Sequence, residues 1–80
     1  MRFRVSITRN EGLADPEGAE TARALADLGY DEVEEVHFGR TITLEITGDD
    51  TAAATARVTE MCRRLLANPV IEDYTIEEVE

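Results

Sequence analysis

Polar and apolar residues alternate along four stretches of the chain, which is the pattern of strands that bury one face. In the first stretch, Phe3, Val5 and Ile7 point one way and polar side chains point the other way. Gly39 lies between the second and third stretches, so we expect a hairpin with a three-residue loop there. The four predicted strands are residues 2–8, 33–38, 41–47 and 70–79.

Two segments between these strands carry apolar residues at helical spacing. Asp15-Pro16 predicts the start of the first helix, because aspartate caps free backbone N–H groups and proline suits the first helical position. Gly29 predicts its end. The second helix is expected over residues 51–67, before Asn68-Pro69 stops it. The stripe of the second helix that we expect to face the core is Ala54, Val58, Met61 and Leu65.

The order of these elements, β-α-β-β-α-β, predicts a single α+β domain over residues 1–80. Its arrangement would be ferredoxin-like, with two helices on one face of a four-stranded antiparallel sheet. Because such a small domain buries a modest core and leaves two sheet edges free, we expect a homodimer or a dimer of dimers. The uncovered face would carry Arg4, Ser6, Thr8, His37, Thr43, Glu45 and Thr75.

The charge of the chain narrows the choice of partners. There are 18 acidic residues against 8 basic ones, all arginine, for a net charge of −10. Such a surface repels nucleic acid and anionic lipid, so we expect neither as a partner. Salt would screen the self-repulsion, and the composition therefore favours a halophilic protein over an ordinary acidic subunit. The chain shows no membrane-spanning apolar run or signal-peptide pattern and has one cysteine, so we expect a cytoplasmic protein.

Chemically reactive side chains are few and scattered. Cys62 falls in the second predicted helix and His37 in a strand, with no second cysteine or histidine to build a metal site. The carboxylates of residues 31–35 would alternate between the two faces of a strand and would not converge on one ion. There is also no glycine-rich phosphate loop. We therefore expect no catalytic residue, cofactor or metal in this chain, and we interpret it as an interaction module.

Several segments match a known family at its own spacing. They are Asp15-Pro16-Glu17-Gly18, Leu28-Gly29-Tyr30, Gly39-Arg40 and, most specifically, the run from Leu65 through Asn68-Pro69 to Glu72-Asp73-Tyr74. On these residues the chain resembles the PurS family, the small subunits of phosphoribosylformylglycinamidine (FGAM) synthase. The resemblance extends over nearly the whole chain.

The resemblance implies a non-catalytic scaffold in purine biosynthesis. The synthase is a carbon–nitrogen ligase in which a glutaminase subunit releases ammonia. A large subunit uses ATP and magnesium to convert formylglycinamide ribonucleotide into its amidine. The small subunit would hold these two partners together, bind no cofactor and show no activity alone. Residues that match the family and are not needed for the core are candidate subunit contacts, namely Asp15, Gly39, Arg40, Asn68, Glu72 and Asp73.

Two alternatives remain open at this point. Helix capping and turn formation explain the six candidate contacts equally well. The same topology also occurs in small-molecule-sensing regulatory domains of the amino-acid-binding type, which would bind a ligand at a dimer interface. Such a domain would accompany a catalytic domain on the same chain, and we expect none in 80 residues.

Overall fold

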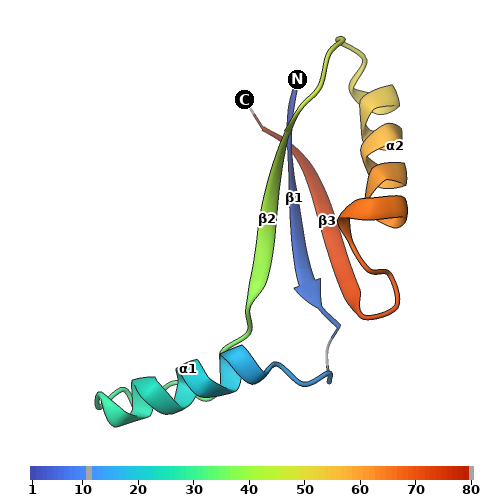
Figure 1. The fold of residues 1–80 in the computed structure, drawn as a ribbon. Coiled ribbons are helices and arrows are strands. Elements are labelled where there is room, and N and C mark those ends of the chain that lie inside the picture. The colour runs from blue at the N-terminus through green and yellow to red at the C-terminus, as the bar shows by residue number, and fades with distance from the viewer. Residues whose placement is uncertain (11, 80) are drawn as a thin grey trace.

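The structure of the protein is a computed structural model that describes residues 1–10 and 12–79. Three strands, two α-helices and one π-helical turn follow one another along the described residues. They are β1 (Arg2–Arg9), α1 (Pro16–Asp27), β2 (Gly39–Glu45), α2 (Thr51–Met61), η1 (Cys62–Leu66) and β3 (Glu72–Val79). The strands form one antiparallel sheet with β1 between β2 and β3 (Figure 1). The helix α2 runs along one side of this sheet, and α1 projects from its end (Figure 1).

The core lies between the central strand and α2. Phe3, Val5 and Ile7 of β1 are at most 1% exposed, as their alternation predicted. They meet Ala54 and Val58 of α2, where the small alanine lets the helix come close to the sheet. In the antiparallel register of β1 and β2, Phe3 and Val5 lie opposite Leu44 and Ile42. The half-buried residues that pack around this core from the edge strands and their ends are Ile42, Leu44, Ile46, Tyr74 and Ile76.

The sheet face turned away from α2 is polar. Two ion pairs cross it, with Arg2 Nε 2.7 Å from Glu45 Oε1 and Arg4 Nη1 3.0 Å from Glu77 Oε1. The predicted composition of this face is confirmed for the residues of the strands. It is wrong for His37, which precedes β2 and lies outside the sheet.

The predicted apolar stripe of the second helix is only half correct. Ala54 and Val58 are buried, but Leu65 is 83% exposed. The α-helix ends at Met61, and η1 follows with the wider hydrogen bond from Ala67 N to Cys62 O, 3.0 Å long. Each residue of a π-helical turn advances by a smaller angle than in an α-helix. As a result Leu66, and not Leu65, packs against the core.

One of the four predicted strands, the second one at residues 33–38, is not formed. This segment has no regular secondary structure and pairs with no strand within residues 1–10 and 12–79, and β2 begins directly at Gly39 without a hairpin. The segment packs on α1 instead, where a Cβ atom added to Gly18 would lie only 1.9 Å from the Val36 carbonyl oxygen. The described sheet is therefore three-stranded, and the four-stranded ferredoxin-like arrangement is not confirmed.

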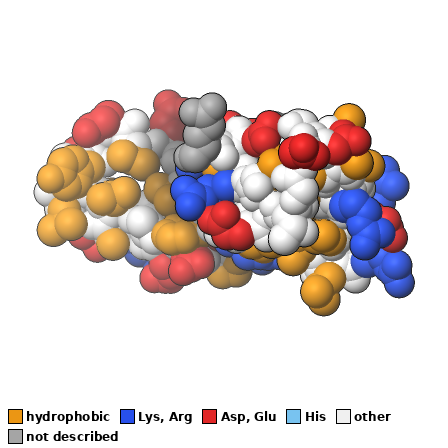
Figure 2. All heavy atoms as spheres, turned by 90° about the horizontal axis from the view of Figure 1, so that it is seen from above, with side chains coloured by type: hydrophobic (Ala, Val, Ile, Leu, Met, Phe, Trp, Pro, Cys, Tyr) orange, Lys and Arg blue, Asp and Glu red, His pale blue; other side chains and the backbone are white. Residues whose placement is uncertain are grey.

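The expectation that both helices cover the sheet is also wrong, because α1 does not lie on it (Figure 1). The chain measures 49 × 28 × 14 Å, and its radius of gyration is 16.2 Å. A compact chain of this length would have a radius of gyration of about 12 Å. Leu28 and Tyr30, at the far end of α1, are 74% and 51% exposed. In Figure 2, hydrophobic side chains gather at the left, the end where α1 lies.

The buried face of β1 generates a stability prediction. Ile7→Val removes one methylene from a side chain that is 1% exposed, and should lower the free energy of unfolding by about 0.5–1.5 kcal/mol. The same change at Ile71, which is 37% exposed, should stay within about 0.5 kcal/mol. Urea denaturation of both variants measures the difference. Equal effects at the two positions would contradict the assigned core.

Candidate functional site

The six candidate contact residues gather at one end of the sheet, where α1 leaves it. Asp15, Gly39, Arg40 and Glu72 line the same open hollow of about 400 Å³. Asp73 lines a neighbouring hollow of about 670 Å³, in which Asp15 also takes part. The remaining candidate, Asn68, donates its backbone N–H to Glu72 Oε1 over 2.8 Å. We call this region the joint.

A bidentate ion pair at the joint connects the edge strands β2 and β3. Arg40 of β2 donates from Nη1 to Glu72 Oε2 over 2.6 Å and from Nη2 to Glu72 Oε1 over 3.0 Å. Arg40 Nη2 also donates to the carbonyl of Leu66, at the end of η1. The side chain of Glu72 is 14% exposed, so this pair is better shielded from water than those on the polar face. The hydrogen bonds from Arg40 and from the Asn68 N–H lower the pKa of Glu72 to about 2.

The carboxylate of Asp15 ties α1 to the start of β2. One oxygen accepts from Gly18 N over 2.9 Å and caps the helix, as the sequence predicted. The other accepts from Phe38 N over 2.8 Å. These two bonds, the one from Phe38 first, hold the pKa of Asp15 below its usual value. The cap therefore also sets where α1 stands relative to the sheet.

The loop between η1 and β3 is fastened to the end of β1. Asn68 accepts from Val70 N at its side-chain oxygen, over 3.1 Å, and from Glu72 N at its carbonyl, over 2.8 Å. Asn10 donates its side-chain amide to the Val70 carbonyl over 3.1 Å and its backbone N–H to the Ile71 carbonyl over 2.8 Å. This asparagine is one of the residues that the sequence reasoning missed.

Arg9 and Gly39 have structural roles at the joint that the sequence did not reveal. Arg9, at the end of β1, lines both hollows and donates to the carbonyl of Ala14 over 2.8 Å. Gly39 was expected in a hairpin loop, but it is needed for a different reason. A Cβ atom there would lie 2.5 Å from the Ile7 carbonyl oxygen, so only glycine lets β2 begin this close to β1.

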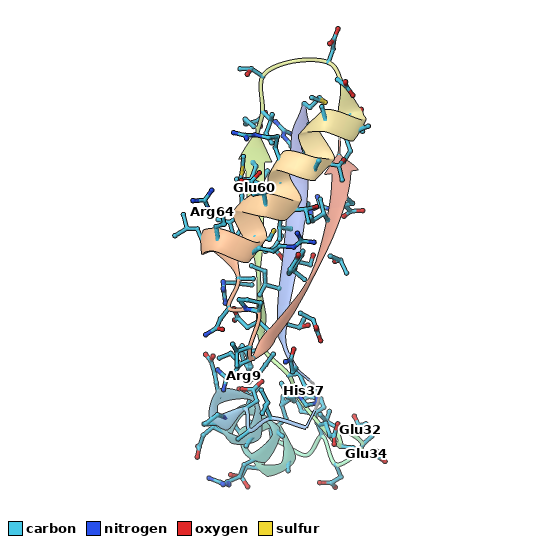
Figure 3. The ribbon with its side chains drawn as sticks, turned by 90° about the vertical axis from the view of Figure 1, so that its right-hand side faces the viewer. Arg9, Glu32, Glu34, His37, Glu60 and Arg64 are labelled. Carbon is cyan, nitrogen blue, oxygen red and sulfur yellow. The ribbon has the colours of Figure 1, made fainter. Side chains whose placement is uncertain are left out.

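The side chains of the joint form hydrogen bonds and ion pairs, and we find no arrangement of described side chains there that suits catalysis. The one cysteine, Cys62, is the first residue of η1 and is buried in the core, and burial raises the pKa of its thiol. His37 lies on the exposed segment before β2, and its Nε2 is 3.1 Å from Glu35 Oε2. Figure 3 shows His37 at the α1 end of the molecule. Among the described residues there is no group of three or more His, Cys, Asp or Glu side chains that could hold a metal ion. Nor is any described helix both long and apolar enough to cross a bilayer.

The two adjacent acidic residues Glu72 and Asp73 have different surroundings. Glu72 is engaged inside the joint by Arg40. Asp73 is exposed at the adjacent sheet edge and remains available to a partner. The structure therefore shows the capping role for Asp15 and the turn role for Asn68, whereas Arg40 and Glu72 join the edge strands and Gly39 lets β2 approach β1. Their role as subunit contacts stays a prediction.

The fold and the joint together define a small α+β protein in which polar side chains of the joint connect the strands, α1 and the loop before β3. A family model described as "PurS: Phosphoribosylformylglycinamidine (FGAM) synthase" matches residues 2–80. The chain belongs to this family.

Individual relatives and solved structures agree with this assignment. The PurS subunit of Methanothermobacter thermautotrophicus is 44% identical, with 95% of this chain and 92% of the relative covered. The crystal structure of Methanocaldococcus jannaschii PurS is similar with a TM-score of 0.83 and 38% identity, covering 99% of this chain and 98% of that one. A chain of the Thermotoga maritima PurLQS structure gives a TM-score of 0.89 at 28% identity, covering 98% and 95%. These findings favour the synthase subunit over the small-molecule-sensing domain.

The Arg40–Glu72 pair generates a prediction about acid stability. The pKa of Glu72 is lower in the folded chain than its ordinary value of 4.5. The pair therefore stabilises the fold fully above about pH 4.5, and this stabilisation is lost as the pH falls towards 2. Glu72→Gln should lower the melting temperature at neutral pH, and its difference from the unaltered chain should shrink through this window.

The control for this experiment is Glu77→Gln, which breaks an ion pair whose side chains are 47% and 60% exposed. Because exposed pairs contribute little, this variant should differ only slightly from the unaltered chain at every pH. Thermal melts followed by circular dichroism from pH 7 to pH 2 give both comparisons. A Glu72→Gln difference that is the same at pH 7 and pH 2 would show that the pair does not stabilise the fold in this way.

Proposed function

We propose that this chain is the small scaffold subunit of an FGAM synthase in purine biosynthesis. It would hold a glutaminase subunit and an ATP-dependent synthetase subunit together, so that ammonia from glutamine converts formylglycinamide ribonucleotide into its amidine. The observation that carries this proposal is the match of 98% of the chain to a chain of the Thermotoga maritima PurLQS structure. Membership of the PurS family over residues 2–80 supports it.

The division of labour follows from the side chains. Neither a nucleophile with a neighbouring base nor a metal-binding cluster lies in the part of the chain that the structure describes. We therefore assign the ligase chemistry, with its ATP and magnesium, to the partner subunits in the cytoplasm, and a positioning role to this chain. Of the six candidate contacts, Asp73 at the edge strand is the one we place against a partner. Charge complementarity at such a rim residue sets orientation and association rate more than affinity.

A homo-oligomer is part of this proposal, because α1 packs on no described strand and on no other described helix of the same chain. Its far end exposes Leu28 and Tyr30, and Phe38 at its base is 41% exposed. The backbone of residues 33–38 pairs with no described strand of the same chain. An exposed edge with apolar side chains is a template for another strand. A second copy, meeting this one across a two-fold axis, would cover the same surface on both chains.

The homo-oligomer can be tested by light scattering at micromolar concentration. The unaltered chain should give the mass of two or four copies. Leu28→Asp should shift it towards monomer, because it places a charge in the proposed contact. Val70→Asp is the matched control, since Val70 is 79% exposed and lies in the loop between η1 and β3, outside the proposed contact. A monomer for the unaltered chain, or equal masses for both variants, would contradict the proposed contact.

The scaffold role predicts a coupling between glutamine hydrolysis and amidine formation. The glutaminase and synthetase subunits mixed without this chain should use free ammonia but use glutamine poorly. Addition of the chain should restore glutamine-dependent synthesis and leave the ammonia-dependent rate almost unchanged, because the chain contributes position and not chemistry. Amidine formation with each nitrogen source measures both rates. Full glutamine-dependent synthesis without the chain would refute the scaffold proposal.

A further inference from the structure

The outer edge of β2 carries backbone groups that β1 does not use. The strand order puts β2 at one side of the sheet, with β1 as its one neighbour among the described residues (Figure 1). Met1 and Ile46 exchange two backbone hydrogen bonds of 2.8 Å and 2.7 Å, so they form a hydrogen-bonded pair of the antiparallel ladder. Such pairs recur at every second residue. The even-numbered residues of β2 therefore direct their backbone groups to β1, and Thr41, Thr43 and Glu45 direct theirs away from it.

The segment before β2 has backbone groups directed to the same outer side. Phe38 donates its backbone N–H to the Asp15 carboxylate over 2.8 Å, and the Val36 carbonyl faces the first turn of α1. In an extended segment, alternate residues direct their backbone groups to the same side. Those of Glu35 and His37 are then directed away from α1, and both residues are exposed. The open edge of this segment therefore continues into the open edge of β2.

This continuous edge is complementary to itself. Its outward backbone groups all belong to odd-numbered residues, and a two-fold axis at Arg40 brings odd-numbered residues of two antiparallel copies opposite one another. The same axis places Phe38 of one copy opposite Ile42 of the other. It also places Val36 opposite Leu44, as in the hairpin that the sequence predicted. Two copies can thus make between them the pairing that one chain does not make.

The charged side chains nearest to this axis are paired within each chain. Arg40 lies at the axis, and its Nη1 is 2.6 Å from Glu72 Oε2. Glu45 would lie opposite Glu35 of the second copy, and Arg2 Nε is 2.7 Å from the Glu45 carboxylate. Like charges opposite each other destabilise a sheet, and these ion pairs reduce that repulsion.

We propose that residues 35–45 of two copies pair antiparallel across a two-fold axis at Arg40, which joins their sheets edge to edge. The occupant of the open β2 edge is therefore a second copy of this chain. Gly39 and Arg40, two of the six candidate contacts, lie at this interface. The inference rests on the homo-oligomer of the proposed function and deepens it by naming the backbone edge and its register. Closing the edge also removes a template on which other chains could aggregate.

Disulfide formation between two introduced cysteines tests the register. His37 of one copy lies opposite Thr43 of the other, and both side chains are exposed. The Cα atoms of a hydrogen-bonded antiparallel pair are about 5.5 Å apart, which suits a disulfide. His37→Cys and Thr43→Cys are prepared as separate proteins, mixed under reducing conditions and then oxidised with diamide. The mixture should form a covalent dimer that links the two altered positions, as seen on a denaturing gel and by mass spectrometry of the linked peptides.

Each variant oxidised alone is the matched control. The axis keeps two copies of the same altered position about 20 Å apart, so neither variant alone should form a covalent dimer. The unaltered chain, treated in the same way, controls for the buried Cys62. Light scattering under reducing conditions checks that both variants keep the mass of the unaltered chain. The double variant, with both changes in one chain, should form covalent dimers and no disulfide within a chain.

Each outcome decides between pairing across the axis and its alternatives. If the unaltered chain is oligomeric and the mixture forms no covalent dimer, the pairing is wrong and the homo-oligomer stands. A disulfide within one chain of the double variant would show a hairpin and overturn the exchange between copies. Equal cross-linking by each variant alone would show random collision, which also overturns the register. If the unaltered chain is a monomer, the homo-oligomer fails and this inference fails with it, whereas glutamine-dependent synthesis separately decides the scaffold role.

Discussion

The position of β1 between the other two strands is the constraint on which the rest of the structure depends. Its backbone pairs with β2 on one side and β3 on the other, and its three buried side chains form the centre of the core. With only α2 to cover it, one layer of apolar side chains is all that this sheet can bury. The chain is therefore stable around one strand and one helix, and every other segment is attached to the ends of this unit.

The joint shows how such an attachment is made with polar groups. The Arg40–Glu72 pair links the two edge strands beyond the apolar core, and Asp15 fixes the start of α1 to the residue before β2. Hydrogen bonds to an ionised carboxylate are stronger than those between neutral groups, so a few of them can hold a helix that has little apolar contact with the sheet. The projecting α1 and the helix α2 therefore lie on different parts of the molecule (Figure 1).

Local signals allowed much of the fold to be predicted. Alternation identified the buried face of β1 and its partners, and Asp15-Pro16 identified the start of α1. The six residues chosen from the family resemblance do gather in space, but most of them serve attachment within the chain. Arg9 and Asn10 were not among the candidate contacts. Asn10 bonds to the Val70 carbonyl, far away in the sequence, and Arg9 lines a hollow with residues of β2 and β3, and periodicity reveals neither position.

The sequence by itself determined the strands that pair around β1, the helix caps, the net charge and the scarcity of chemical groups, because each depends on neighbouring residues or on composition. Only the tertiary structure decided the fate of residues 33–38, since the close approach of Val36 to Gly18 keeps them on α1 and out of the sheet. Tertiary structure also decided which of two adjacent leucines is buried. Both Leu65 and Leu66 fit a helical pattern, and the choice between them depends on the width of one turn, which packing against the sheet fixes and periodicity does not encode.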